Sequence, residues 1–141
     1  MIKTEWNHML MDVEKTLQLG RAYMEDAERS EEQSDYIAAK SIYHMCCDMF
    51  SGVLKQHSSC EIEAKGEYMH TLFRCAMLPQ TKQKEKMQYL NQAYQLASEL
   101  EKETGDMEYT IAIGCIQEEI EELNKVMQQQ MRQRQSEILP F

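Results

Sequence analysis

The chain has 141 residues, which is the size of one domain and enough to bury a hydrophobic core without disulfides or a structural metal. Its formal charge of −9 argues against nucleic acid as a partner, because phosphate binding requires a basic surface. No apolar run approaches the length of a membrane span, and the first residues lack the apolar stretch of a signal peptide. We therefore expect a cytoplasmic protein with no direct membrane insertion.

The five cysteines are an odd number and show no spacing typical of a disulfide framework. Reduced thiols are the simplest interpretation. The helical pattern places four of them on apolar faces, where cysteine behaves as a small hydrophobic residue. Only Cys60, in a predicted turn, is expected to be accessible.

The first predicted helix covers residues 6–27, where apolar residues recur in alternating steps of four and three from Trp6 through Leu10 onward. A second helix is predicted over residues 30–56. Its start is indicated by Ser30 and Gln33, which have the spacing of a capping box. Because its apolar face is broad, this helix is expected to be central in the fold.

A third helix is predicted from residue 61 to Pro79, where the missing amide hydrogen and the ring of proline end it. A fourth helix is expected from Thr81 to Gly105, since glycine takes the left-handed conformation found at helix ends. Asp106 is the expected cap of a fifth helix with an apolar stripe over residues 113–127. The glutamine-rich residues 128–135 indicate a fraying helix end, so the sequence predicts one domain over residues 1–135 and a tail over 136–141.

Long helices joined by short turns must lie antiparallel to their neighbours. The predicted fold is therefore all-α, with about five antiparallel amphipathic helices stacked as helical hairpins. Four glycines lie inside these helices, where each costs up to about 1 kcal/mol relative to alanine. Such a cost favours close helix approach at these positions, which are Gly20, Gly52, Gly66 and Gly114.

The region 89–114 resembles a junction between two tetratricopeptide repeats. Its features are a helix of the type A-x-x-L-A-x-E-L at residues 93–100, a Gly-Asp turn at 105–106 and a small residue at Gly114. The tryptophan and the closing proline of that repeat are missing at the corresponding positions of this region. The resemblance implies stacked helical hairpins in which the first helix of each repeat lines a concave peptide-binding groove.

Residues 15–78 resemble a different family, the MIT domain, a three-helix module that binds the tails of membrane-remodelling filament proteins. The likeness lies in small and large apolar residues of the second and third helices, including Tyr43, Phe50 and Leu72. It leaves residues 81–141 unexplained, whereas the tetratricopeptide-like pattern extends over the whole chain. Either resemblance implies a module that binds a peptide in a helical groove.

The sequence contains neither a C-x2-C pair nor an H-E-x-x-H motif, and His57 with Cys60 offers only two ligands across a turn. No nucleophile elbow, phosphate loop or dinucleotide-binding motif is present. Carboxylate pairs such as Glu118 and Glu119 fit a solvated helix surface better than acid-base chemistry. We therefore expect no enzymatic activity, no metal and no cofactor.

The best candidate surface is a polar stripe on the third helix, whose members are spaced four, three and four residues apart on one face. An ordinary solvated face would have the same pattern. As a binding surface, the stripe is expected to take a basic or amphipathic helical segment of another polypeptide, and acidic residues of the fifth helix would extend it. The candidate residues are Glu63, Glu67, His70 and Arg74 on the third helix and Glu118 and Glu121 on the fifth.

Three functions stay open at this point. The first is an adaptor or chaperone that binds a peptide in a helical groove. The second is a structural protein that forms a homodimer through the apolar stripe at residues 113–127, which only the fourth helix is expected to cover. The third is an enzyme or small-molecule sensor with a methionine-lined pocket, for which no residue pattern argues.

Overall fold

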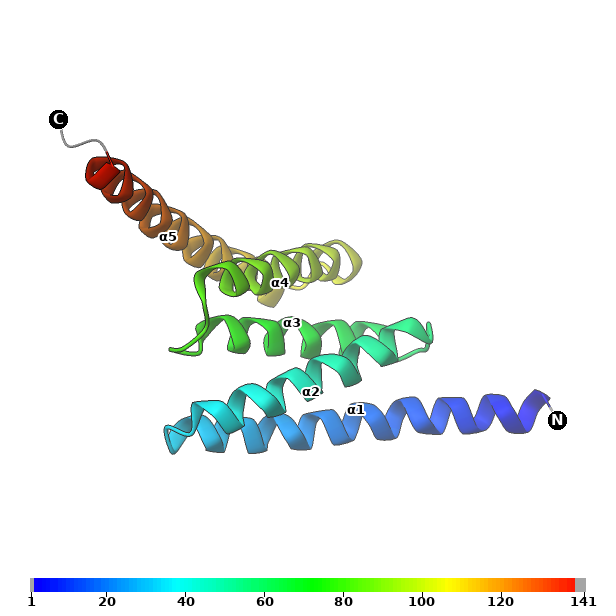
Figure 1. The fold of residues 1–141 in the computed structure, drawn as a ribbon. Helices are drawn as coiled ribbons and strands as arrows, with labels where there is room; N and C mark the ends of the chain where they lie inside the picture. Colours follow the sequence, from blue (N-terminus) through cyan, green and yellow to red (C-terminus); the bar gives the residue numbers. More distant parts are fainter. Residues whose placement is uncertain (1, 139–141) are drawn as a thin grey trace.

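The computed structural model describes the backbone of residues 2–138 and the side-chain environments of residues 12–137. The described backbone is all-α, as the sequence predicts, and residues 2–138 contain no strand. The helices follow one another through short turns (Figure 1). Their bounds are Ile2–Glu32 for α1, Tyr36–Lys55 for α2, Glu61–Met77 for α3, Gln83–Thr104 for α4 and Met107–Ile138 for α5.

Each helix packs mainly against its neighbours in the sequence, and α1 also reaches α3. Figure 1 shows the resulting stack, in which α1, α2, α3 and α4 lie one above the other and α5 turns away from the top. In this arrangement of antiparallel hairpins, most of the buried hydrophobic side chains form two clusters.

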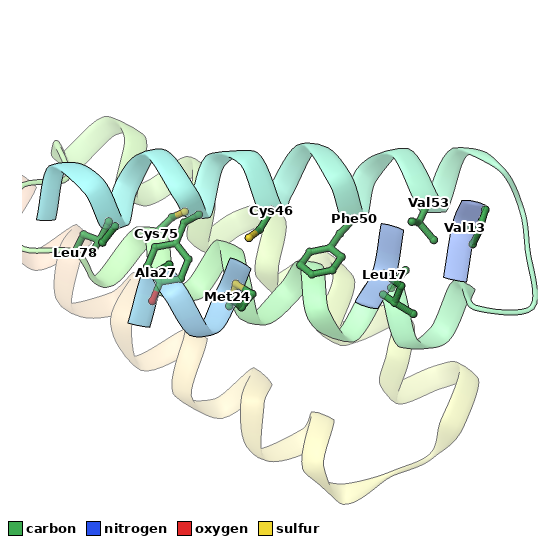
Figure 2. Packing of buried hydrophobic residues seen from close by; sticks show 12 residues of the cluster. Val13, Leu17, Met24, Ala27, Cys46, Phe50, Val53, Cys75 and Leu78 are labelled. Carbon is green, nitrogen blue, oxygen red and sulfur yellow. The ribbon is translucent and has the colours of Figure 1, made fainter. Parts of the chain in front are cut away.

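The first cluster joins α1, α2 and α3 (Figure 2). On α1 the predicted steps of four and three are confirmed at Val13, Leu17, Met24 and Ala27, which are all buried. The predicted stripe members Trp6 and Leu10 lie outside the residues whose side chains are described. The α2 side of this cluster consists of Ala39, Tyr43, Cys46, Phe50 and Val53.

Gly20 allows α1 and α2 to approach closely. A Cβ atom at this position would lie 2.6 Å from Cε1 of Phe50, whose ring points from α2 towards α1 (Figure 2). The predicted close approach is thus correct at Gly20. It is wrong at Gly52 and Gly114, where an added Cβ would meet nothing within 4 Å, and at Gly66 the Cβ would make only an ordinary contact.

The second cluster joins α3, α4 and α5. In the apolar stripe of α5, Ile116 and Leu123 are buried against the side chains of α3 and α4. This stripe is therefore covered within the chain. The two clusters are connected by three partly buried side chains that pack against both of them, Cys47, Tyr68 and Tyr89.

The predicted start of the second helix was wrong. α1 continues through Ser30 to Glu32, and α2 begins at Tyr36. Ser34 adopts a left-handed conformation, with φ of 62°, which ends α1. Asp35 then caps α2, since its Oδ1 accepts a hydrogen bond of 3.2 Å from the backbone N of Ala38.

The other helix ends lie close to their predicted positions. α3 ends at Met77, two residues before Pro79, and Gly105 ends α4 with φ of 67°. Asp106 accepts a hydrogen bond from the backbone N of Glu108 and so caps α5. The predicted fraying is not observed, because α5 continues through the glutamines to Ile138, and glutamine is a good helix former.

The cysteines are only partly as predicted. Cys46 and Cys75 are buried, whereas Cys60 is half-buried and Cys115 is exposed, so the prediction that only Cys60 is accessible was wrong. Burial raises the pKa of the Cys46 thiol to about 11. Within the described part of the chain, no helix combines the length and the apolar character that crossing a membrane requires.

Candidate functional site

Two neighbouring hollows lie between α3 and α5. We call them the apolar hollow, of about 140 Å³, and the polar hollow, of about 310 Å³. They adjoin at Met69 and His70, which line both, and we refer to the two together as the α3/α5 groove. The apolar hollow is completed by Phe73, Ala112, Cys115 and Ile116, and the polar hollow by Arg21, Glu63, Gly66, Glu67, Glu108 and Tyr109.

The lining residues come from α1, α3 and α5, and none comes from α2 or α4. This follows from the stacking of antiparallel hairpins, which places every second helix on the same side of the stack. The even-numbered helices complete the two clusters behind the groove.

The polar hollow is acidic. Arg21 of α1 binds Glu63 through Nη2 and Glu67 through Nε, each at 3.2 Å. Burial tends to lower the pKa of Arg21, but the hydrogen bonds to the two carboxylates outweigh this and raise the pKa. Glu108 of α5 adds a third carboxylate from the opposite wall. One guanidinium therefore faces three carboxylates, which leaves an excess of negative charge.

Tyr109 forms part of the opposite wall of the polar hollow. A Cβ atom at Gly66 would lie 3.6 Å from its hydroxyl, so the lack of a side chain at Gly66 leaves space in the groove. Burial, with smaller contributions from Glu108 and Asp106, raises the pKa of Tyr109. The hydroxyl is therefore neutral at physiological pH and can donate or accept a hydrogen bond.

His70 lies where the two hollows meet, and half of its side chain is exposed. Its Nε2 is 3.7 Å from Oε1 of Glu28 on α1. Together with Glu63 and Glu67, His70 forms the part of the predicted stripe that the fold places in the groove.

Arg74 continues the same face of α3, but its guanidinium binds side chains of α1 and α2. Its Nε donates a 3.1 Å hydrogen bond to Tyr43 Oη, and its Nη2 lies 3.3 Å from Oε1 of Glu31. Tyr43 in turn donates a 2.6 Å hydrogen bond to the same Glu31 oxygen. Burial, followed by this hydrogen bond to Glu31, raises the pKa of Tyr43. The three side chains tie α1, α2 and α3 together.

Glu118 and Glu121 are exposed on α5 and line neither hollow. The α5 wall is formed instead by residues closer to the start of the helix, which sequence reasoning missed. The tetratricopeptide-like pattern could have indicated these residues. In that pattern, the helix that begins after the Gly-Asp turn is the first helix of the next repeat, and its first turns line the groove. The missed residues are Glu108, Tyr109, Ala112, Cys115 and Ile116.

The groove contains titratable side chains, among them His70, Cys115 and Glu108. Over the described residues, no set of three or more histidine, cysteine or acidic side chains is arranged to hold a metal ion. The groove does combine an apolar surface with an acidic one at its end, which suits the binding of an amphipathic ligand.

Comparisons with protein-family models, with curated proteins and with solved structures give no match to this chain. Over residues 2–138 the structure shows five α-helices, which pack as successive neighbours.

Proposed function

We propose that this protein is a non-enzymatic interaction module that binds an amphipathic, basic helical segment of another polypeptide in the α3/α5 groove. The observation that carries the proposal is the division of one groove into an apolar hollow and an acidic hollow. A helix with apolar and basic side chains on the same face would satisfy both at once.

The apolar hollow would supply most of the binding energy. Its lining is almost entirely carbon and sulfur from side chains such as Met69, Phe73 and Ile116. Full burial of one aliphatic side chain of the partner contributes about 1.5 to 3 kcal/mol. The flexible side chain of Met69 would adjust to partners of different shape.

The polar hollow would select the charge of the partner. A lysine or arginine of the partner would meet Glu63, Glu67 and Glu108, of which the first two are already held by Arg21. Exposed ion pairs contribute only about 0.2 to 1 kcal/mol each. The acidic hollow would therefore exclude acidic partners and speed association more than it would tighten binding.

The groove also sets a spacing for the partner. Phe73 of the apolar hollow and Gly66 of the polar hollow are seven residues apart on α3, which is about 10.5 Å along a helix. A partner helix that lies along α3 would place an apolar residue and a basic residue at the same separation. The expected motif is therefore an apolar residue at position i and an arginine or lysine at i+7.

The order of the helices supports the tetratricopeptide-like interpretation over the MIT-like one. In tetratricopeptide proteins the first helix of each repeat lines the groove, and here the groove is lined by α1, α3 and α5. Under this proposal the chain would form two helical hairpins followed by the first helix of a third repeat. A role as an adaptor or a chaperone in the cytoplasm is part of the same proposal.

The proposal can be tested by fluorescence anisotropy with a labelled helical peptide that carries leucine at i and arginine at i+7. We expect saturable binding, and weaker binding of a peptide in which glutamate replaces the arginine. Glu108→Lys should weaken binding of the arginine peptide about tenfold, because attraction is replaced by repulsion. The matched control is Asp48→Lys, an equal charge change on the outer face of α2, where Asp48 is exposed and lines neither hollow.

If Glu108→Lys and Asp48→Lys weakened peptide binding equally, binding would reflect the overall charge of the protein. The groove would then be refuted as the binding site. Ala112→Phe gives a second check that does not depend on charge, because the added ring would fill the apolar hollow. Unchanged peptide affinity in the Ala112→Phe protein would exclude the apolar hollow as the binding site.

A further inference from the structure

The last turns of α5 form an exposed amphipathic segment. All side chains from 128 to 137 are exposed, and Met131 is 60% exposed although it is apolar. Four residues at positions i, i+3, i+4 and i+7 share one face and line a shallow hollow of about 330 Å³ beside Gln83. We call this the tail face, and it consists of Met127, Gln130, Met131 and Arg134.

The charge of this segment is opposite to that of the chain as a whole. Residues 124–137 contain Lys125, Arg132 and Arg134 but only one acidic residue, Glu137, whereas the complete chain has a formal charge of −9. Of these three cations, Arg134 lies on the tail face, and it is the basic counterpart of the polar hollow, where Glu63, Glu67 and Glu108 outnumber Arg21.

The tail face places an exposed apolar side chain beside a basic one. Met131 lies three residues before Arg134 on the same face of α5, which is about 4.5 Å along the helix. The apolar and polar hollows adjoin at Met69 and His70. Met131 can therefore lie in the apolar hollow while the long side chain of Arg134 reaches into the polar hollow.

The groove of the same chain is out of reach for this segment. The first turns of α5, including Tyr109 and Ile116, themselves line the groove, and α5 is one continuous helix from Met107 to Ile138. Figure 1 shows the end of α5 pointing away from α3. A tail face that enters a groove must therefore enter that of another molecule.

We propose that the tail face of one copy binds in the α3/α5 groove of a second copy, so that the protein associates with itself. The inference rests on the proposed function, because it requires the groove to accept a basic amphipathic helix. The contact is heterologous, since it joins two different surfaces of the chain. Two copies can exchange tails reciprocally, or further copies can add in a row.

The test uses light scattering coupled to size exclusion on the full-length chain over a range of concentrations. The wild type should associate as concentration rises. Association should weaken at least about tenfold in a tail variant, Met131→Glu with Arg134→Glu, and in a groove variant, Glu108→Lys. The matched control is Arg132→Glu, because Arg132 lies on the opposite side of α5 from the tail face.

Mixing the two defective proteins provides the decisive measurement. The groove variant retains an intact tail face and the tail variant retains an intact groove, so an equimolar mixture should form a 1:1 complex although neither variant associates alone. A mixture that stays monomeric would overturn the proposal. Association of either variant alone with the affinity of the wild type would also overturn it, because a different surface would then join the copies.

The same proteins separate this inference from the proposed function. The wild type could stay monomeric and still bind the labelled arginine peptide, with weaker binding in the Glu108→Lys protein. In that case the groove is a binding site, and the proposal that it binds the tail face of a second copy is wrong. If the wild type neither associates nor binds the peptide, both proposals are wrong. Folding of each variant is checked by far-ultraviolet circular dichroism. Arg132→Glu controls for the charge reversal at Arg134, and Asp48→Lys controls for the charge reversal at Glu108.

Discussion

Replacing Gly20 with alanine tests the closeness of α1 and α2. In most helix interiors this substitution stabilises the protein, because alanine is favoured over glycine by about 0.5 to 1 kcal/mol. At Gly20 the new methyl group would lie 2.6 Å from Cε1 and 2.8 Å from Cζ of Phe50. Carbon atoms in contact normally lie about 3.5 to 4.0 Å apart, so the ring or the helix must move by about 1 Å.

The cost of this movement outweighs the gain in helix propensity. Phe50 is completely buried, with 0% exposure, and its ring has no solvent to move into. Overpacking a well-packed core costs about 1 to 3 kcal/mol. We expect Gly20→Ala to lower the free energy of unfolding by about 1 to 2 kcal/mol, which is a decrease in Tm of about 2 to 8 °C for a domain of this size.

Gly52→Ala is the matched control, because Gly52 also lies inside a helix and an added Cβ there would meet nothing within 4 Å. It should raise the free energy of unfolding by about 0.5 to 1 kcal/mol. Urea unfolding followed by circular dichroism measures both variants, and an unchanged m-value would indicate that only stability has changed. The two substitutions should therefore have opposite signs.

Combining Gly20→Ala with Phe50→Leu provides a further check. A smaller side chain at position 50 removes the clash, so the double variant should be more stable than the sum of the two single effects indicates. If Gly20→Ala stabilised the protein as much as Gly52→Ala does, the close contact between α1 and α2 would be refuted.

Three further predictions concern other parts of the molecule. Lys65→Met should lower the free energy of unfolding by about 1 to 2 kcal/mol in urea titrations, and by less at high salt, because it leaves the three carboxylates around the Lys65 ammonium unneutralised. Tyr43→Phe should cost about 1 to 2 kcal/mol in the same assay by removing the hydrogen bond to Glu31, and no loss would mean that Glu31 and Arg74 suffice without it. Iodoacetamide at pH 8 should modify the exposed Cys115 well before the buried Cys46, whose raised pKa of about 11 leaves about one thiolate in a thousand, and mass spectrometry of the modified peptides would reveal the reverse order.

Most of the fold could be predicted from the sequence because apolar periodicity and helix-ending residues act locally. Pro79 and Gly105 end their helices for reasons contained in those residues. The start of α2 was wrong because two capping signals compete within a few residues. Ser30 has the capping-box spacing, but the left-handed conformation of Ser34 and the side chain of Asp35 place the turn later.

The candidate site was harder to predict because it depends on which side chains meet between helices. Periodicity placed Glu67 and Arg74 on one face of α3. The fold uses them differently, since Glu67 lines the groove while Arg74 is held by Tyr43 and Glu31. A test of the groove by substitution of Arg74 would therefore also weaken the packing of α1 on α3. Glu108, which sequence reasoning missed, is the better position for such a test.

The two hydrophobic clusters, which share helix α3, have a consequence for folding. Every large interface forms between helices adjacent in the sequence, so contact order is low and we expect folding within milliseconds or faster. Helix α3 contributes buried side chains to both clusters, so the central helices are held from two sides, whereas the end of α5 is exposed. Native-state hydrogen exchange should therefore show the amides at the end of α5 exchanging before those of α2.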